Sequence, residues 1–432
     1  MNINANLQTA IWLRLILYSF SRGFVFSRCM NTPKQQNNGL LILILGLLTA
    51  IGPLSIDMYL PGFSVIAADL NTSIEMVGYS LSSFFVGICV GQLLSGPLLD
   101  RFGRKKPLYV GLVIYILASV GCGLSDSVEM LIGFRFLQAL GGCVGMVAPS
   151  AVVRDSFPVE QSARVFSMLI LILGVSPILA PTLGGFIVSG WGWKPVFFVL
   201  AGITLLILIT VIVALLETKQ PDPNYSLHPK AILGNFFEVI KNRQFMTYAM
   251  AGNTVSAGLF AYLAGSPFVF MEMHGVSQQA YGWIFGLIAA GLITASQINN
   301  LILKKHKSER ILRTVITVQM ILGIIMWTGS WLQIFNLYSL IIIMMLFLSC
   351  QGFIFPNAAA MAMAPFTRHA GSAAALMGAI QMALGAFTSA LVGIFFNETI
   401  MPMVSIMLVF CLTGFTLLVI GQNKLKRQEA LA

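Results

Sequence analysis

Long apolar stretches dominate this chain and limit the folds that it can adopt. A bilayer core about 30 Å thick needs about 20 apolar residues for each helix that crosses it, and twelve stretches approach or exceed that length. Only 9 % of the residues are charged, against roughly 25 % in a typical soluble domain. Transmembrane β-strands would instead give runs of about ten alternating residues. The sequence therefore predicts an all-α integral membrane protein, with helices near 39–66, 77–99, 107–124, 128–152, 164–189, 195–216, 245–270, 279–303, 312–332, 337–362, 372–396 and 401–421.

The longest polar segment between these stretches divides them evenly. It lies at 217–243, and its later part, Ala231–Asn242, has the mixed composition of an amphipathic surface helix. Six stretches precede it and six follow, which is typical of transporters built from two parallel halves. We expect an N-terminal tail at 1–38, a first half at 39–216, a linker at 217–243, a second half at 244–421 and a tail at 422–432.

The basic residues predict the orientation in the membrane. All of the 25 Lys and Arg residues except Lys194 and Arg135 fall in the two tails or in alternate loops. Basic loops stay on the cytoplasmic side, so we expect both termini in the cytoplasm of a bacterium and the helices in its inner membrane. This distribution also accounts for the net charge of +10 without a nucleic-acid partner.

The first 29 residues fit neither a membrane span nor a signal peptide. Their apolar part, Ile11–Phe20, is short and contains Arg14, whereas a signal peptide has a longer apolar core and a small-residue cleavage site. An interfacial amphipathic segment is one interpretation. We favour the other, a mis-assigned start in which Met30 is the first residue of the protein.

A run of ten residues, Gly96–Lys105, gathers glycines, an acid and bases into one short loop. The bases alone would serve as topology signals and lipid anchors, but that role requires neither the acid nor the glycines. Asp155, in the next loop on the same side, is a candidate ion-pair partner for Arg104. The residues that we assign to this cytoplasmic motif are Gly96, Asp100, Arg101, Gly103, Arg104, Lys105 and Asp155.

Further motifs support a resemblance to a known family. The Gly96–Lys105 run resembles the loop 2–3 motif of the major facilitator superfamily, Leu131–Gly142 its helix-4 motif, and Gly174–Gly185 the helix-5 motif of its drug:proton antiporters. Shorter matches resemble the bicyclomycin/chloramphenicol-resistance (Bcr/CflA) family: Asp57–Pro61, Phe260–Tyr262 with Ser266–Phe268, and Phe355–Ala358. One departure is Trp193–Pro195, where Lys194 stands in place of the family's arginine. In that family the loop charges latch the two halves on the cytoplasmic side, which would place Asp100 near the start of the helix at 372–396, around Gly371.

Two charged residues lie well inside the predicted helices. Asp57 is an acid in the first apolar stretch, and an ionised carboxylate there must face water, pair with a base or take up a proton. Arg135 is a base at comparable depth in the fourth, with Gln138 on the same helix face. We expect Asp57 to couple transport to protons and Arg135 and Gln138 to line a central cavity and tune Asp57 by charge. The simpler alternatives are an acid that reaches the interface and a structural ion pair.

The fifth stretch and the second half supply the remaining candidates. Small and kinking residues recur on one face at three- and four-residue intervals, which permits close approach of a neighbouring helix; they are Gly174, Pro177, Pro181, Gly184 and Gly185. The second half has no buried charge, but its helices carry polar side chains. Of these we select Tyr262 and Asn357 as substrate contacts.

These observations predict a secondary transporter that exports drugs or small amphipathic molecules in exchange for protons by alternating access. No phosphate-binding Gly-x-x-x-x-Gly-Lys-Ser/Thr run, metal-ligand cluster or catalytic constellation is found in the sequence. We therefore expect no ATP, cofactor or metal, protons as the coupling ion, a drug-like substrate in a lipid bilayer, and a functional monomer. A metabolite importer or facilitator of the same fold is the alternative within transport, and a polytopic membrane enzyme is the alternative outside it.

Overall fold

The computed structural model describes residues 38–157, 159–222, 229–366 and 370–429, and in these ranges the chain is helical with no strand. Residues 1–37 of the tail expected at 1–38, and with them the suggested start at Met30, lie outside the described residues. Twelve segments are long and apolar enough to cross a membrane, so the predicted fold class is confirmed.

The first six spans contain seven α-helices, because a short 3-10 turn interrupts the first span. That span runs from α2 through η1 to α3, which begins at Phe63 directly after the turn. Pro61 has no N–H for an α-helical hydrogen bond, which favours the turn. The elements are α2 (Asn38–Asp57), η1 (Leu60–Gly62), α3 (Phe63–Asp69), α4 (Ile74–Phe102), α5 (Lys105–Gly123), α6 (Val128–Ser156), α7 (Val159–Trp191) and α8 (Lys194–Ala214).

The other six spans follow a linker helix. α9 (Pro229–Lys241) falls where the sequence predicts an amphipathic helix; it buries Phe236 and Val239 and exposes Phe237 and Ile240. The π-helical η2 extends α10 within one span, and α13 and α14 together form another. The elements are α10 (Arg243–Pro267), η2 (Phe268–Met273), α11 (Gln278–Ile302), α12 (Ser308–Trp331), α13 (Leu337–Ser349), α14 (Gln351–Met363), α15 (Ala370–Ile394) and α16 (Met401–Glu429).

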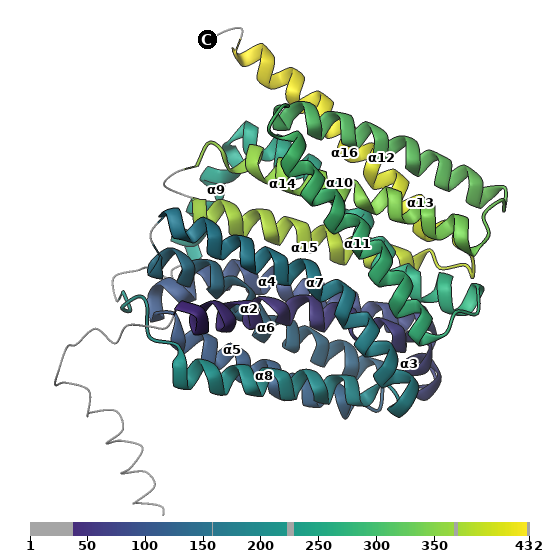
Figure 1. The fold of residues 1–432 in the computed structure, drawn as a ribbon, viewed down its shortest axis with the longest axis horizontal. Helices are drawn as coiled ribbons and strands as arrows, with labels where there is room; N and C mark the ends of the chain where they lie inside the picture. Colours follow the sequence, from purple (N-terminus) through teal and green to yellow (C-terminus); the bar gives the residue numbers. More distant parts are fainter. Residues whose placement is uncertain (1–37, 158, 223–228, 367–369, 430–432) are drawn as a thin grey trace, which may run out of the picture. The chain divides into compact units, whose positions relative to one another are not determined.

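Two helix pairs join the first six spans to the last six. α4 packs along α15, and α7 packs along α11, as Figure 1 shows near its centre. In both pairs, the second span of one set meets the fifth span of the other. This exchange is the arrangement expected of two related six-helix halves, and we call the two contacts the α4/α15 seam and the α7/α11 seam.

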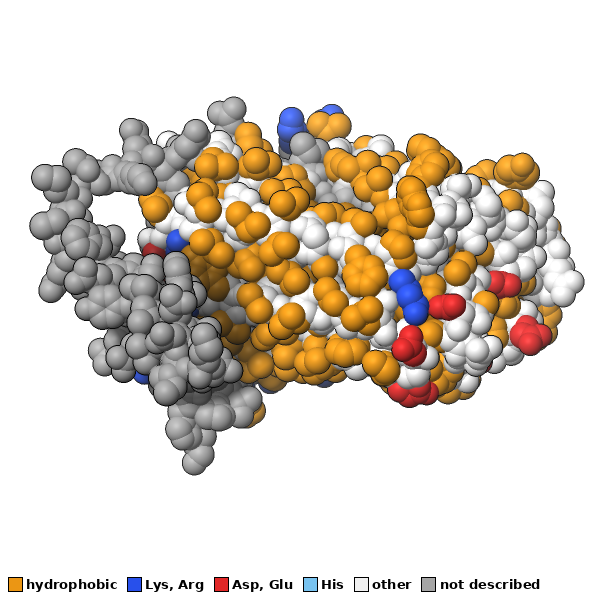
Figure 2. Space-filling view, turned by 90° about the horizontal axis from the view of Figure 1, so that it is seen from below, with side chains coloured by type: hydrophobic (Ala, Val, Ile, Leu, Met, Phe, Trp, Pro, Cys, Tyr) orange, Lys and Arg blue, Asp and Glu red, His pale blue; other side chains and the backbone are white. Residues whose placement is uncertain are grey.

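The surface matches a bilayer in its polarity. Hydrophobic side chains cover the middle of the face in Figure 2, and acidic side chains gather toward one end. Large apolar side chains are exposed around the helices, as in Val213 at 80 % and Leu117 at 66 %. We call the end with the 102–105 loop the motif end. The other end, with the 69–74 and 191–194 loops, we call the far end.

Candidate functional site

Asp57 is the last residue of α2, at the point where the first span breaks. Its side chain is only 5 % exposed. The break turns the chain so that the Met58 carbonyl packs directly on Gly184 of α7. The break segment also contacts α10 and α11. Asp57 therefore lies where the first half meets the second, toward the far end.

The Asp57 carboxylate has no partner in the described structure. Among the described residues, no cation lies within ion-pair distance of its carboxylate and no hydrogen bond to it is formed. Tyr262 of α10 and Tyr281 of α11 are also buried. Tyr281 Oη is hydrogen-bonded to Ser266 Oγ at 2.9 Å. The Tyr262 hydroxyl is buried and has no hydrogen-bond partner among the described residues.

Arg135 lies in a different environment from the one expected. Its guanidinium carbon is 4.2 Å from the ring centroid of Tyr59 and 4.1 Å from that of Phe84. Nη1 donates to Gln138 Oε1 at 2.6 Å, and Gln138 Nε2 donates to Ser119 Oγ at 2.7 Å. Arg135 Nε and Nη2 are buried without a partner in the described structure.

The suggested pairing of Arg135 with Asp57 is therefore corrected. Beyond the end of α2 the chain turns and places the Tyr59 ring against the Arg135 guanidinium, and no ion pair joins Arg135 to Asp57 in the described structure. Arg135 and Gln138 are both 0 % exposed and form a closed polar cluster inside the first half. Their contact with substrate stays a prediction.

The two candidates of the second half lie in separate places. Tyr262 is 1 % exposed and stacks near Phe285, with ring centroids 5.7 Å apart. Asn357, in α14, donates from Nδ2 to Asn299 Oδ1 at 2.7 Å and to the Phe353 carbonyl at 2.8 Å. The structure places Tyr262 against Phe285 of α11 and leaves Asn357 in a polar pair between α14 and α11.

The helix-5 motif lies on the face of α7 that meets the other half. A Cβ added at Gly185 would come within 2.5 Å of the Gln278 carbonyl oxygen, and one at Gly282 of α11 within 2.8 Å of the Pro181 carbonyl oxygen. Gly174, farther along α7 toward the motif end, has ordinary contacts with Ile293. Backbone thus packs on backbone at the far end of the α7/α11 seam.

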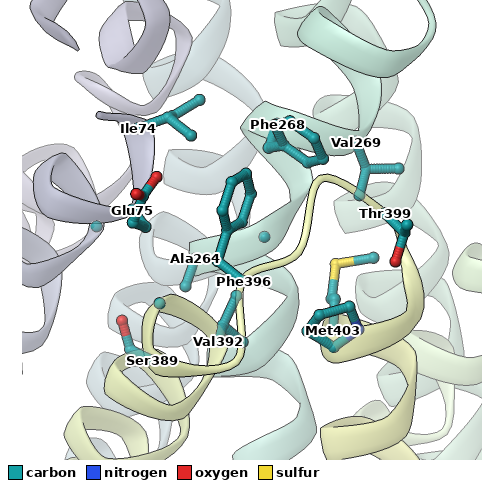
Figure 3. Close-up of a pocket in the computed structure, with 14 residues that line it drawn as sticks. Ile74, Glu75, Ala264, Phe268, Val269, Ser389, Val392, Phe396, Thr399 and Met403 are labelled. Atoms are coloured by element: carbon teal, nitrogen blue, oxygen red, sulfur yellow. The ribbon is translucent and has the colours of Figure 1, made fainter. Parts of the chain in front are cut away.

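The α4/α15 seam is also tightly packed toward the far end. Ser82 Oγ donates to Ser389 Oγ at 2.9 Å. Figure 3 shows a small hollow beside Ser389, with Phe268 and Phe396 above it; their ring centroids are 4.7 Å apart. The hollow holds about 20 Å³, far below the roughly 300–1,000 Å³ of ligand pockets. This hollow is too small for a drug-sized molecule, and hollows of about 560 and 520 Å³ lie nearer the surface at the same end.

A larger cavity opens at the motif end. It has a volume of about 630 Å³ and lies between α4, α6, α9 and α15. Polar and charged side chains line one wall, and Gly371 and Ser372 of α15 line another; the polar wall includes Gln92, Asp100, Arg104, Ser150, Arg154 and Asp155. Asp100 and Gly371, which the family resemblance places near each other, line this same cavity. Gly96 also lines it, and a Cβ at Gly96 would meet nothing within 4 Å.

The loop motif forms an ion-pair cluster around Arg104. Arg104 is 5 % exposed; its Nε lies 2.7 Å from Asp155 Oδ2, and its Nη1 lies 3.2 Å from Asp100 Oδ1. The ion pair expected between Arg104 and Asp155 is present. Burial opposes the guanidinium charge, but the hydrogen bond and charge of Asp155, together with Asp100, outweigh it and raise the pKa of Arg104 above its usual value.

Two residues after α8 complete this cluster and were missed in the sequence. Glu217 accepts hydrogen bonds from the backbone N–H groups of Arg104 at 2.7 Å and Lys105 at 3.1 Å, at the start of α5. Lys219 Nζ lies 2.7 Å from Asp100 Oδ1. The sequence did contain a signal for them, namely an acid and a base directly after the sixth apolar stretch. We interpreted that segment only as a linker.

The rest of the motif has simpler roles. Gly103 has φ +80°, in the left-handed region that favours glycine, and a Cβ there would lie 3.0 Å from Glu217 Oε2. Arg101 Nη1 donates to the Asp222 carbonyl at 3.2 Å. Lys105 Nζ lies 5.6 Å from the Tyr109 ring centroid. Gly103 and Arg101 thus join the loop to the segment that follows α8, whereas the contact of Lys105 stays within α5.

Comparison with known proteins agrees with this architecture. The model of the Major Facilitator Superfamily matches residues 45–390. The chain is 34 % identical over 388 residues to the uncharacterized MFS-type transporter YdgK of Bacillus subtilis (strain 168), covering 89 % of this chain and 96 % of YdgK. It is 30 % identical over 370 residues to the bicyclomycin resistance protein homolog of Haemophilus influenzae, covering 86 % of this chain and 93 % of that protein.

More distant matches extend the same pattern. The multidrug resistance protein MdtL of Escherichia coli is 30 % identical over 353 residues, covering 80 % of this chain and 87 % of MdtL. Among solved structures, a bacterial homolog of the human lysosomal transporter Spinster superimposes with a TM-score of 0.71 at 14 % identity, covering 89 % of this chain and 97 % of that one. A D-xylose-proton symporter gives 0.66 at 15 %, covering 87 % and 97 %. These matches confirm the family resemblance seen in the motifs.

Proposed function

The chain belongs to the Major Facilitator Superfamily, and on that premise we propose that it exports drugs or small amphipathic molecules in exchange for protons. Relatives named for bicyclomycin and multidrug resistance support export of drug-like substrates. We propose that it works by alternating access as a monomer in the bacterial inner membrane, without ATP or an organic cofactor and with protons as the coupling ion.

The observation that carries the coupling proposal is the buried carboxylate of Asp57. It lies at the break in the first span and has no cation within ion-pair distance in the described structure. A carboxylate in such a place is costly when ionised. It can therefore take up a proton when the far end opens and release it when the motif end opens.

The cavity at the motif end and the close packing of the seams at the far end support a state that is open at the motif end. The cavity of about 630 Å³ is there, and both seams are closely packed toward the far end. We propose that the motif end is cytoplasmic, since the loops there are basic while the far-end loops carry acids such as Asp69, Glu272 and Glu398. Substrate would then enter the cavity from the cytoplasm.

One proton is sufficient to drive this exchange. Moving one charge through 100 mV releases about 2.3 kcal/mol, equivalent to a roughly 50-fold gradient of a neutral substrate. A single coupling carboxylate therefore meets the energetic need, and the proposed mechanism requires no second buried acid.

The test is drug resistance of an efflux-deficient host that expresses the chain or its Asp57→Asn variant. We expect the chain to raise the inhibitory concentration of chloramphenicol or ethidium at least fourfold. The amide cannot carry the proton, so Asp57→Asn should abolish this gain at equal membrane abundance. The matched control is Asp126→Asn, because Asp126 is exposed and forms only a long pair with Lys194, at 3.5 Å. Full resistance with Asp57→Asn would rule out the coupling role.

Direction of transport separates export from import. In inside-out vesicles acidified inside by respiration, an exporter accumulates ethidium, and collapse of the pH gradient releases it. An importer or facilitator would show no gradient-driven accumulation. A membrane enzyme would yield a chemically altered compound, so mass spectrometry of the accumulated ethidium tests that alternative in the same samples.

A further inference from the structure

The motif-end cavity extends inward past the ion-pair cluster around Arg104. At a helix rise of 1.5 Å per residue, Gln92 lies about 12 Å farther inward along α4 than Asp100. We call this part the inner end of the cavity. The residues that line it are Gln92, Met146, Val147, Ala374 and Ala375. None of these side chains is charged, and Gln92 alone among them is polar, so the inner end is an apolar space with one amide in its wall.

The Gln92 amide rests on bare backbone of the other half. A Cβ added at Gly378 of α15 would lie 2.5 Å from Gln92 Oε1 and 3.0 Å from Gln92 Nε2. The amide therefore packs across the α4/α15 seam at a position that has no side chain. Gln92 Oε1 is buried and has no hydrogen-bond partner in the described structure. Buried polar groups in native proteins are nearly always paired, so this acceptor requires an explanation.

Polar groups nearer the mouth of the cavity are already engaged. Arg104 holds both Asp155 and Asp100, at 2.7 and 3.2 Å. Ser150 Oγ donates to the Val147 carbonyl at 2.9 Å. Gln92 differs from these residues, because its amide oxygen makes no bond within the described part of the protein.

A turn of the amide would present this oxygen to the cavity. Gln92 lines the cavity while its Oε1 lies against Gly378. The last torsion of a glutamine side chain is broad and roughly two-fold, so a half-turn exchanges the oxygen and the nitrogen. Because Oε1 has no partner, the turn breaks no hydrogen bond of this atom. The acceptor is therefore available to a molecule that reaches the inner end.

We propose that Gln92 is a substrate-recognition residue, whose Oε1 accepts a hydrogen bond from an uncharged N–H or O–H group of the transported molecule. The apolar body of that molecule packs on Met146 and Ala375. The donor is an uncharged group because no charged side chain lines the inner end. A cavity of about 630 Å³ is within the roughly 300–1,000 Å³ of small-molecule sites. This inference rests on the proposed function and narrows its substrates to amphipathic molecules with such a donor.

The test measures binding to the purified chain by equilibrium dialysis. Chloramphenicol and ethidium carry N–H or O–H donors, whereas tetraphenylphosphonium carries none. Gln92→Leu removes the acceptor and keeps a side chain of similar size. We expect it to weaken the binding of both donor-bearing probes about fivefold, the effect of one lost hydrogen bond. The affinity for tetraphenylphosphonium should stay unchanged, because that ion cannot use the amide oxygen.

Ser150→Ala is the matched control. Ser150 lines the same cavity, but its hydroxyl already donates to a backbone carbonyl, so the loss of this hydroxyl should leave all three affinities unchanged. Gln92→Met, which keeps the length of the side chain, takes the place of Gln92→Leu if the leucine protein does not fold.

Three results would overturn the proposal. The first is a parent chain that binds neither chloramphenicol nor ethidium. The second is a folded Gln92 variant that binds both as tightly as the parent chain does. The third is an equal loss of affinity for tetraphenylphosphonium, which would make Gln92 a packing residue of the seam and not a recognition residue.

Dialysis measures binding without transport, so the two proposals can fail separately. If Asp57→Asn keeps full drug resistance, the coupling role fails, and the dialysis result for Gln92 still decides the recognition proposal. If Asp57→Asn abolishes resistance while Gln92→Leu binds both donor-bearing probes normally, only the recognition proposal fails. If both proposals hold, Gln92→Leu lowers resistance to chloramphenicol and leaves resistance to tetraphenylphosphonium unchanged.

Discussion

Single residues at the motif end show why a guanidinium is needed there. Arg104 contacts Asp155 through two nitrogens, Nε at 2.7 Å and Nη2 at 3.3 Å, and reaches Asp100 with a third. A lysine keeps the charge but offers one point contact. We expect Arg104→Lys to lower the free energy of unfolding by about 1–3 kcal/mol. Thermal denaturation of the purified protein in detergent measures this loss.

Arg154 provides the matched control for that substitution. It lies beside Asp155, and its Nε donates to the Ser150 carbonyl at 3.1 Å. Arg154→Lys should leave the melting temperature nearly unchanged. Equal melting temperatures for Arg104→Lys and the parent chain would show that the bidentate contact contributes no stability. Because the pKa of Arg104 is raised, its charge persists across the physiological range, and this difference should not depend on pH above neutrality.

At this scale, the sequence predicted contacts only where residues lie in neighbouring loops. Arg104 and Asp155 are both at loop ends on one side of the membrane, so their pairing follows from topology. Asp57 and Arg135 are at similar depth, but depth does not give direction. The side on which each side chain lies depends on the turn at Met58 and Tyr59, which places Tyr59 against Arg135 and the Met58 carbonyl against Gly184. No periodic pattern in the sequence encodes that turn.

Whole elements were easier to predict, because each span has to satisfy its own backbone hydrogen bonds in lipid. The predicted stretches correspond to the twelve spans. The interruptions within spans were harder to predict, since η1 and η2 are short and lie in apolar sequence. The α7 glycine face was visible as a spacing pattern, but its partners α11 and Met58 could only come from the three-dimensional arrangement.

The α7 face yields a prediction about one added methyl group. A Cβ at Gly184 would overlap the Met58 carbonyl, whereas one at Gly190 of the same helix meets nothing within 4 Å. Overpacking against backbone typically costs about 1–3 kcal/mol, so Gly184→Ala should disfavour the state closed at the far end. We expect at least a tenfold loss of ethidium efflux at normal membrane abundance. Gly190→Ala should transport normally, and normal efflux by both variants would contradict a close-packing role for Gly184.

At the scale of the whole molecule, two seams close one end and leave a cavity at the other. The hydrogen bond between Ser82 and Ser389 bridges the halves at 2.9 Å across the α4/α15 seam. The two hydroxyl oxygens meet across the seam, so cysteines at these positions would bring their sulfurs together, and we expect Cβ atoms near the roughly 3.5–4.5 Å of a disulfide. Cysteines at both positions, in a chain whose six native cysteines are replaced, should therefore cross-link on oxidation and hold the far end shut.

Alternating access requires that this lock stop transport without closing the motif end. Oxidation of the Ser82→Cys/Ser389→Cys protein should lower its rate of ethidium efflux at least tenfold, and reduction should restore the rate. Oxidation should leave the rate of the Ser82→Cys single variant unchanged. A third cysteine at Ser150, which lines the motif-end cavity, should react with a polar maleimide from that side equally fast before and after oxidation. If the cross-linked protein still transports, transport does not require the halves to separate at the far end of the α4/α15 seam. A mechanism in which the halves rock apart at that place is then excluded. If the lock instead protects Ser150→Cys, closing the far end also closes the motif end, and the two ends do not open in alternation.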